Sequence, residues 1–318
     1  MTMHFDPNEP LWVERYRPST VEDCILQPSV KREAAAMVKQ GVIPNLLFHG
    51  PAGCGKTTLA KALCKENGVD WMLINGSNER GIDVIRHKIV EFASTTSLSG
   101  KAQKCVIIDE SDRLTPEAQD ALKTEIENFS TDCSFILTAN HPNRIIAPLL
   151  SRCTGIDFAP KKGEVEQMQA LVFDRVCKVL DNEKITYDEA VLVNIVQRFF
   201  PDTRRILGEL QKYSMGSGEI NEGLLMNIQE ANVDRLIEAL KSKKFKTVLQ
   251  WAADNASMDS SVMYGQLYNE LRTMIDPKSF FEAILIIEDY QRHDSVVPSK
   301  EVNLASLGVE LMKSVEFT

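Results

Sequence analysis

Short apolar runs alternate with amphipathic helical stretches over the first half of the chain, up to about residue 159. The helical stretches include residues 82–93 and 115–129. Each run is almost continuously apolar, which predicts a strand that is covered on both faces. Strands that alternate with helices in this way predict an α/β fold with a parallel sheet. The expected strands are residues 46–48, 71–74, 105–108, 134–138 and 155–158.

The stretch 115–129 carries its own start signal. Thr115 is suited to cap the N-terminus of a helix, and Pro116 fits the first helical position, where an N–H is not needed. Ala118, Leu122 and Ile126 then fall on one face at helical spacing. The pattern therefore predicts an amphipathic helix that begins at this point.

Beyond residue 159 the pattern changes. Residues 160–163 predict a linker, and after it we expect helices and no further strands. Residues 164–180, 188–198 and 203–213 predict a small three-helix unit. Residues 215–218, which contain two glycines, are expected to interrupt the chain again.

From about residue 231 onwards the whole pattern is helical. One predicted helix carries its apolar residues in a single stripe, namely Met263, Leu267, Leu271 and Met274. Asp276-Pro277 ends this helix and starts another, which carries Phe280, Phe281, Ile284 and Leu285. The sequence thus predicts three domains, over residues 1–159, 160–230 and 231–318.

The composition is that of an ordinary globular protein, with 318 residues, 43% apolar and 25% charged. The seven cysteines are scattered, odd in number and without a C-x-x-C pair. This usage favours reduced thiols in the cytoplasm over disulfides or structural zinc. Residues 1–6 have no basic or long apolar segment, so we expect no signal peptide, and the apolar patch 283–287 is too short to cross a bilayer.

The net charge of −9 argues against a general nucleic-acid binder. Net charge averages over whole surfaces, however. A ring-shaped assembly can keep a few cations on its inner face and acidic residues outside. The charge therefore makes DNA contact less expected without excluding it.

A glycine-rich loop supplies the first chemistry. Gly50-Pro51-Ala52-Gly53-Cys54-Gly55-Lys56-Thr57 fits the pattern G-x-x-x-x-G-K-[ST], between an expected strand and a helix-forming stretch. The glycines let backbone N–H groups face a polyphosphate at a helix N-terminus. Lys56 would neutralise the β- and γ-phosphates, and the Thr57 hydroxyl would bind magnesium. A tight turn before a helix is the alternative, but the loop with both flanks predicts a nucleoside triphosphate site.

Asp109 and Glu110 end the expected strand 105–108. The end of a parallel strand lies at the sheet edge that also carries the phosphate loop. There Asp109 could hold magnesium through water, and Glu110 could polarise the attacking water. A solvated acidic pair that ends a strand is the alternative interpretation.

Three further polar residues are weaker candidates. Asn140 follows the expected strand 134–138, where its amide could orient water and the γ-phosphate, although asparagine there is commonly a turn former. Arg152, within Ser151-Arg152-Cys153, would by itself be taken as a surface cation. Arg204 lies in a helix first turn capped by Asp202, where a nearby triphosphate would offset its unfavourable interaction with the helix dipole.

The order of these motifs resembles the AAA+ clamp-loader ATPases, which include eukaryotic and archaeal replication factor C small subunits. The length, Phe200-Pro201-Asp202 and the C-terminal region are most similar to the large clamp-loader subunits of T4-type bacteriophages. Ser111 stands where the family usually has Ala, and Asn78 where Asp is more frequent. The motifs that carry the resemblance are Trp12…Tyr16-Arg17-Pro18, Gly50…Thr57, residues 75–83, Asp109-Glu110, Thr115…Gln119, Asn140 and Ser151-Arg152-Cys153.

The resemblance implies a role for individual positions. Asn140 and Arg204 would be the two nucleotide sensors, and Arg152 an arginine finger that acts on ATP bound by a neighbouring subunit. Gln119 would couple the DNA-facing helices to the catalytic Glu110. The residues implied in binding ATP are Val13, Glu14, Arg15, Tyr16 and Ile25 at the adenine, and Gly53, Cys54, Gly55, Lys56, Thr57 and Thr58 at the phosphates.

The resemblance also implies partners. Arg80 and Arg86 would approach DNA template phosphates as a ring of subunits, a pentamer in this family, winds around primer–template DNA. Residues 1–159 would be the ATPase domain, 160–230 a helical lid, and 231–318 a collar that holds the subunits together. ATP and Mg²⁺ would be the cofactors, and a sliding clamp and a second loader subunit the protein partners.

Two alternative functions stay open at this point. A AAA+ DNA motor or replication initiator shares the phosphate loop and the acidic pair, but lacks Ser151-Arg152-Cys153 and usually carries a basic DNA-binding domain near its C-terminus. After residue 231 the cations are isolated or clustered only at 241–246. A non-hydrolysing scaffold paralogue typically loses the loop lysine or the catalytic glutamate, and this chain has Lys56 and Glu110.

Overall fold

The computed structural model describes residues 9–78, 82–95, 103–227, 233–256, 260–294 and 296–317. The chain divides into two compact units, Met1–Leu225 and Met226–Thr318. The first contains a parallel sheet followed by helices, and the helices α11 to α15 make up the core of the second. The position of the sheet in the N-terminal half agrees with the predicted order of strands and helices.

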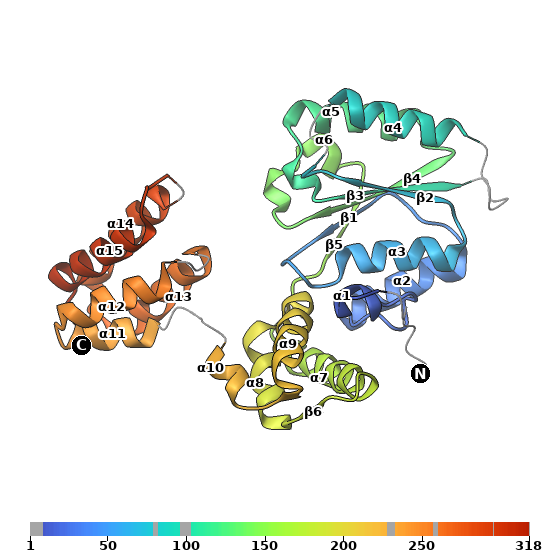
Figure 1. Cartoon of the computed structure of the whole chain (residues 1–318). Helices are drawn as coiled ribbons and strands as arrows, with labels where there is room; N and C mark the ends of the chain where they lie inside the picture. The colour runs from blue at the N-terminus through green and yellow to red at the C-terminus, as the bar shows by residue number, and fades with distance from the viewer. Residues whose placement is uncertain are drawn as a thin grey trace. The chain divides into compact units, whose positions relative to one another are not determined.

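A five-stranded parallel sheet forms the centre of the first unit (Figure 1). Its strand order is β2-β3-β4-β1-β5. Each apolar run forms one strand, so the predicted parallel α/β sheet is confirmed. The strands are β1 (Leu46–His49), β2 (Trp71–Asn75), β3 (Lys104–Asp109), β4 (Cys133–Ala139) and β5 (Thr154–Asp157).

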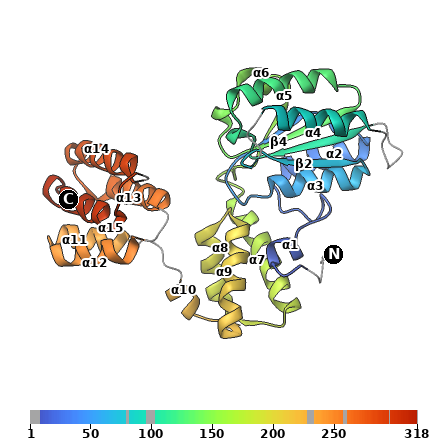
Figure 2. The same cartoon turned by 45° about the horizontal axis from the view of Figure 1, so that its top comes forward.

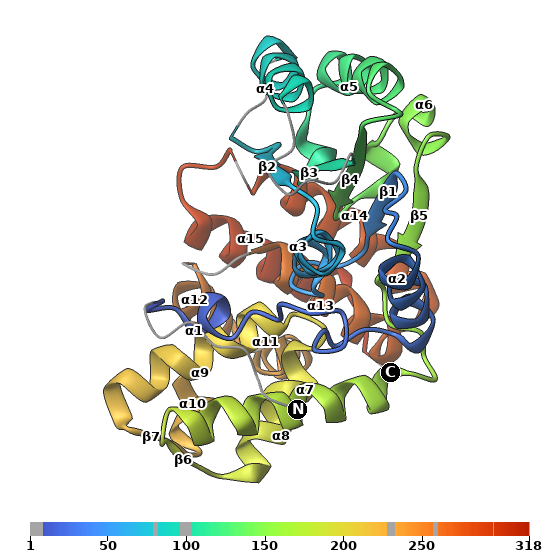
Figure 3. The same ribbon diagram turned by 90° about the vertical axis from the view of Figure 1, so that its right-hand side faces the viewer.

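Helices cover both faces of this sheet because successive strand side chains point in opposite directions. Leu46 and Phe48 of β1 pack in the core on the side of α2 and α3, while Leu47 packs on the side of α4, α5 and α6. Figure 3 shows the two helical layers on either side of the strands. The helices are α1 (Trp12–Arg15), α2 (Pro28–Gln40), α3 (Lys56–Asn67), α4 (Ile82–Ser94), α5 (Pro116–Asn128) and α6 (Ala147–Leu150).

Helix α5 begins as its sequence predicts. The Thr115 Oγ1 accepts a hydrogen bond from the Ala118 N–H at 3.2 Å, and Pro116 occupies the first helical position. Ala118, Leu122 and Ile126 are buried against the sheet. The predicted cap and the predicted apolar face are both confirmed.

The edge strand β2 differs from the prediction that every strand is covered on both faces. Trp71 and Leu73 of β2 are each 39% exposed. An edge strand has a neighbour on one side only, and β2 pairs with β3 alone. The central strands β3 and β4 are buried along almost their whole length, as expected.

The prediction that strands are absent after residue 163 is wrong in one detail. Three helices follow β5, and two short strands pair in parallel beside them. Two-residue strands carry no readable alternation of apolar and polar positions, which is why the pattern missed them. The elements are α7 (Val165–Asn182), β6 (Thr186–Tyr187), α8 (Glu189–Phe199), α9 (Thr203–Ser217), β7 (Glu219–Ile220) and α10 (Gly223–Asn227), with the helices grouped in Figure 2.

Helix α9 also continues further than predicted. Met215 and Gly216 are helical, and the helix ends at Gly218, which adopts the left-handed conformation with φ of 75°. A glycine reaches this conformation without a steric penalty, and a helix commonly ends at such a residue. Of residues 215–218, where an interruption was predicted, only the last, Gly218, lies outside the helix.

The second unit has a core of its own. Met263, Leu267 and Leu271 are buried in it and Met274 packs against it, so the predicted apolar stripe is confirmed. The helix ends and the next begins around Asp276-Pro277, as predicted. The helices are α11 (Val233–Lys241), α12 (Phe245–Asn255), α13 (Ser260–Met274), α14 (Pro277–His293) and α15 (Lys300–Ser314). Of the helices that the structure describes in either unit, none has the length and apolarity to span a membrane.

Candidate functional site

The phosphate loop leaves β1 and enters α3 at Lys56. Gly55 precedes the helix with φ of 96°, a conformation that L side chains rarely adopt, so the glycine is required there. The Lys56 side chain is buried, and its Nζ donates to the carbonyl oxygens of Gly50 at 2.8 Å and Pro51 at 2.6 Å. The ammonium group is therefore held inside the loop, where the pattern predicts it.

Asn140 lies against the same lysine. It follows the last residue of β4, and its Oδ1 accepts from Lys56 Nζ at 2.9 Å. In a parallel sheet the carboxyl ends of adjacent strands lie at one edge, and β1 and β4 are neighbours. The fold thereby brings the predicted sensor and the loop cation together.

Thr57 and Asp109 also meet at this edge. The Thr57 hydroxyl donates to the Asp109 Oδ1 at 2.6 Å, and the Thr138 hydroxyl donates to the same oxygen at 2.6 Å. A hydroxyl next to a carboxylate provides the hard oxygen donors that Mg²⁺ prefers. Over the described residues, no group of three or more His, Cys, Asp or Glu forms a metal site. Magnesium that binds here would thus complete its shell with phosphate oxygens and water, as in other nucleotide sites.

Glu110 adopts a left-handed backbone conformation, with φ of 54°. Its carboxylate accepts a hydrogen bond from the Ser77 hydroxyl and lies 3.2 Å from the Arg113 Nε. A non-glycine residue in this region is uncommon and costs free energy, so surrounding contacts must hold it. One of these contacts comes from Gly76, whose N–H donates to the Asp109 carbonyl at 2.8 Å. Neither Ser77 nor Arg113 was predicted as a site residue.

Lys56, Thr57, Asp109, Glu110 and Asn140 border one cavity of about 700 Å³. It lies between the carboxyl edge of the sheet, the segment before α2 and the helices α7 and α9. The predicted residues that line it are Val13, Glu14, Tyr16, Ile25, Gly53, Cys54, Gly55, Lys56, Thr57, Thr58, Asp109, Glu110, Asn140 and Arg204. Lining residues to which the sequence assigned no site role include Arg17, Cys24, Met168, Val172, Arg175, Thr203 and Leu207.

Helix α9 closes one side of the cavity. Asp202 caps it by accepting from the Arg205 N–H at 3.0 Å, as predicted. The neighbouring Thr203 hydroxyl donates to the Gly53 carbonyl at 2.8 Å, so the start of α9 touches the phosphate loop. This contact places Arg204 at the cavity, while the guanidinium of Arg205 stacks over the Phe199 ring at 4.3 Å.

The N-terminal segment forms another wall. Glu14 pairs with Arg17, and a hydrogen bond from Arg17 lowers the pKa of the Glu14 carboxyl. Arg17 also donates to the Thr58 hydroxyl at 3.1 Å, in the first turn of α3. Arg15, which was expected at the adenine, instead bonds the Glu183 carboxylate at 2.7 Å. Only Val13, Glu14 and Tyr16 of the expected stretch 13–16 border the cavity.

Comparisons with known proteins agree with this geometry. Residues 46–160 match the model of the "ATPase family associated with various cellular activities (AAA)". The chain is 35% identical over 305 residues to the sliding-clamp-loader large subunit of Enterobacteria phage T4, covering 94% of each protein. It is 34% identical over 275 residues to the replication factor C small subunit of Methanoculleus marisnigri, covering 84% of this chain and 82% of that protein. The chain belongs to the AAA+ clamp-loader family.

The predicted resemblance is thereby confirmed. The match to the AAA model and these relatives support ATP hydrolysis as the activity of this clamp-loader ATPase. A solved structure of the Thermotoga maritima RuvB Holliday junction branch-migration motor is also similar. Its TM-score is 0.52 at 19% identity, over 72% of this chain and 80% of that one. At this identity the likeness shows the fold alone, and the motor alternative gains nothing from it.

Two of the predicted site residues of this clamp-loader ATPase, Arg152 and Gln119, do not line the cavity. The Arg152 guanidinium donates to the Glu127 carboxylate and, at 2.7 Å, to the Pro148 carbonyl. Gln119 is buried on α5, where its amide bonds the Leu114 and Arg144 carbonyls. Its Oε1 accepts from the Ile146 N–H at 2.9 Å, so Gln119 ties α5 to the segment after Asn140. All three of these partners are backbone groups, and the coupling of Gln119 to Glu110 stays a prediction.

The two expected DNA contacts fare differently. Arg80 lies outside the described residues. Arg86 is on α4, with its side chain 47% exposed, and its Nε lies 3.1 Å from the buried Glu125 carboxylate of α5. The pair joins α4 to α5 and leaves part of the Arg86 guanidinium open to solvent.

Proposed function

We propose that this chain is an ATP-hydrolysing subunit of a DNA polymerase sliding-clamp loader. ATP binding drives clamp opening and the grip on primer–template DNA, and hydrolysis releases the closed clamp on DNA. The observation that carries the proposal is the single cavity that gathers Lys56, Thr57, Asp109, Glu110 and Asn140 in a chain of clamp-loader length. The same cavity argues against a scaffold paralogue, because its catalytic groups are complete.

The chain's own residues would divide the work as follows. Lys56 exchanges its bonds to loop carbonyls for the β- and γ-phosphates, and α3 presents its N-terminal N–H groups to them. Glu110 orients the attacking water, while Asn140 and Arg204 contact the γ-phosphate side of the nucleotide. Bound Mg²⁺, held by Thr57 and through water by Asp109, supplies charge neutralisation at the phosphates. Burial raises the pKa of the Cys54 thiol, so this loop side chain stays uncharged beside them.

The remaining parts of the chain would serve the assembly. In this proposal residues 1–159 are the ATPase domain, residues 160–230 a lid over the nucleotide, and residues 231–318 a collar. Several copies and a second loader subunit form a pentamer in the cytoplasm, where Arg152 of each copy reaches ATP on its neighbour. The sliding clamp and primer–template DNA are the further partners.

Two exposed apolar features of the second unit support the collar role. Phe281 and Leu285 of α14 are 73% and 70% exposed and stand one helical turn apart. Tyr290, nine positions after Phe281, lies on the opposite side of α14 and borders a groove. Other apolar residues of that groove are Phe245, Leu249, Val302, Ala305 and Val309. An exposed apolar patch on one side and a groove on the other suit head-to-tail association, which forms a ring where the rotation between copies closes.

Replacing Phe281 and Leu285 together by Ser should weaken assembly. The two side chains are exposed, so the unit should stay folded, while the apolar area that association would bury is removed. Light scattering of the mixed subunits should show a lower mass at concentrations where the wild type assembles. Glu282→Ser, also exposed on α14, is the matched control. An unchanged mass for the double variant would exclude this patch from the subunit interface.

Replacing Arg80 and Arg86 by Ala should weaken binding to primer–template DNA and make it less dependent on salt. Removal of one arginine–phosphate interaction is expected to reduce the slope of log affinity against log salt by about 0.9. Because Arg86 neutralises the buried Glu125, the replacement is best made in a Glu125→Gln background and compared with Glu125→Gln alone. ATP binding without DNA should change little. A slope equal to that of Glu125→Gln would rule out both arginines as DNA ligands.

The function as a whole is tested by ATP hydrolysis with different partners. A loader should show low activity alone and strong joint stimulation by its clamp, its second subunit and primed DNA. A motor of the alternative class should respond to duplex DNA without a clamp. Stimulation by duplex alone would therefore replace the clamp-loader proposal with the motor.

A further inference from the structure

The N-terminal strap, residues 10–17, is fastened to α7 and α9 at two separate points. At the first, the Glu183 residue that follows α7 accepts from the Tyr16 hydroxyl at 2.5 Å and from the Arg15 Nη1 at 2.7 Å, with the same Oε1. The Arg15 and Glu183 side chains are 20% and 19% exposed. A pair so sheltered from solvent is screened less than one on the open surface.

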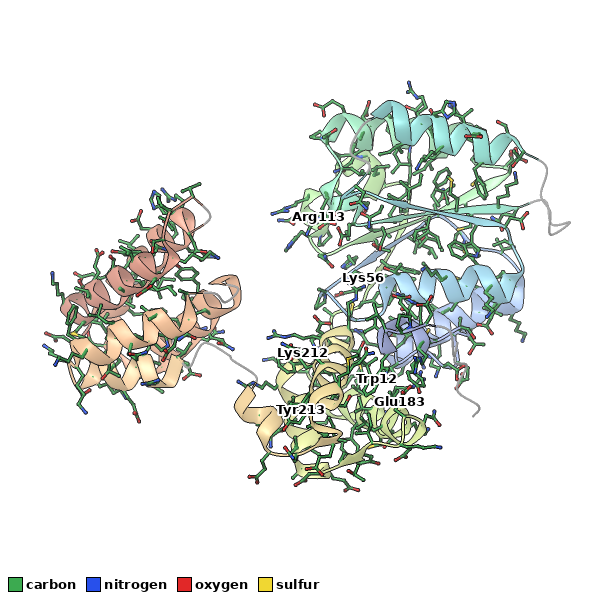
Figure 4. All side chains as sticks on the ribbon, in the orientation of Figure 1. Trp12, Lys56, Arg113, Glu183, Lys212 and Tyr213 are labelled. Atoms are coloured by element: carbon green, nitrogen blue, oxygen red, sulfur yellow. The ribbon has the colours of Figure 1, made fainter. Side chains whose placement is uncertain are left out.

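The second fastening is made by the Gln211 amide of α9. Its Oε1 accepts from the Trp12 N–H at 2.9 Å, and its Nε2 donates to the Pro10 carbonyl at 2.7 Å. The Gln211 side chain thus forms hydrogen bonds with two backbone groups of the strap, as the backbone of a neighbouring β-strand would. The Trp12 side chain is buried, with 4% exposed, and α1 packs on α9 (Figure 4).

The other end of the strap is attached to the phosphate-binding helix. Arg17 bonds the Thr58 hydroxyl in the first turn of α3 and pairs with Glu14. The cavity is lined by three residues of the strap, Val13, Glu14 and Tyr16. The strap therefore spans from the helices after β5 to the phosphate loop and borders the space beside it.

We propose that Glu183 and Gln211 are positioning residues that hold the strap against the lid helices, so that recognition of the nucleotide base depends on the lid. The inference rests on the proposed function and on the expectation that Val13, Glu14 and Tyr16, which border the cavity, contact the adenine. Neither Glu183 nor Gln211 is among the described residues that border the cavity. Both act through the strap.

The charges at the first fastening favour this arrangement. Burial and the hydrogen bond to Glu183 raise the pKa of Tyr16, so its hydroxyl remains a donor. Arg15 supplies the cation that Glu183 needs in this sheltered place. The fastening thus holds Tyr16 by its hydroxyl at the border of the cavity.

The test compares a ligand that has a base with one that has none. Affinities of the full-length chain for Mg-ATP and for magnesium tripolyphosphate should be measured by calorimetry for the wild type, Glu183→Ala, Gln211→Ala and the control Glu166→Ala, an exposed residue of α7. We expect Glu183→Ala to bind ATP about tenfold more weakly, the effect of removing hydrogen bonds to a charged group. Tripolyphosphate should bind as in the wild type. Gln211→Ala should show the same loss for ATP only, and Glu183→Gln, which keeps an acceptor for Tyr16, a smaller one.

The outcomes separate the positioning role from the proposed function. Equal losses for ATP and tripolyphosphate would mean that Glu183 and Gln211 merely stabilise the fold, which overturns the positioning role. Unchanged affinities in both variants would overturn it as well, while ATP binding by the wild type would leave the proposed function intact. A wild-type chain that does not bind ATP would overturn both.

Discussion

Glu110→Gln is expected to bind ATP with nearly wild-type affinity and to hydrolyse it about 10²–10⁴-fold more slowly, the range found when a general base is removed. Glutamine keeps the size of the side chain and an oxygen that Arg113 and Ser77 can still bond, so the cavity should keep its shape. It lacks the negative charge that polarises water. Rapid-quench hydrolysis alongside equilibrium binding of ATP measures both quantities.

Lys56→Ala is the matched comparison, because it removes the cation from the phosphate loop and should abolish productive binding itself. With clamp and primed DNA present, Glu110→Gln should accumulate the ternary complex, whereas Lys56→Ala should not form it. If Glu110→Gln hydrolysed ATP at the wild-type rate, the catalytic base would have to be sought elsewhere.

Arg152→Ala should have almost no effect on an isolated subunit and a large effect in the assembly. Its present partner, Glu127, has a side chain 53% exposed, and ion pairs of this kind contribute little to stability. The variant should therefore fold and bind ATP normally. An arginine finger that stabilises the transferring phosphoryl group contributes about 10³–10⁵ in rate, so clamp- and DNA-stimulated hydrolysis should fall by a large part of this factor.

Mixed assemblies give the sharper form of this test. Neither Arg152→Ala nor Lys56→Ala alone should be stimulated by clamp and DNA. A mixture of the two contains interfaces at which Arg152 of one copy faces Lys56 of the next, and these should recover part of the activity. Wild-type hydrolysis by pure Arg152→Ala assemblies would identify Arg152 as a surface cation.

The sequence predicted the sheet and the phosphate side of the site because both depend on local patterns. Apolar runs identify buried strands, and the residues at their carboxyl ends, such as Asp109 and Asn140, must then meet at one edge. Trp71 departs from the pattern because burial at an edge strand depends on what lies beside it, and strand order was not readable from the chain. The two-residue strands β6 and β7 were too short to show alternation.

The base side of the site could be predicted only in part. Tyr16 was identified through a family motif, whereas Glu183 and Gln211 belong to no motif and meet the strap only in the folded chain. A glutamate after a helix and a glutamine within one are ordinary surface residues in sequence. Ser77 lies within a family motif and Arg113 lies close after another, so both could have been suspected, but their bonds to Glu110 depend on its unusual backbone conformation.

The contact between α9 and the phosphate loop limits which residues the loop can accept. In the pattern G-x-x-x-x-G-K-[ST] position 53 is free, yet here a β-carbon on Gly53 would collide with the Asp202 carboxylate and approach its Cα at 2.9 Å. Gly53 also has φ of 69°. An alanine at this position would push the start of α9, and Arg204 with it, away from the phosphate loop. The residues that position 53 of the motif can accept are thus limited by α9, a helix much further along the sequence.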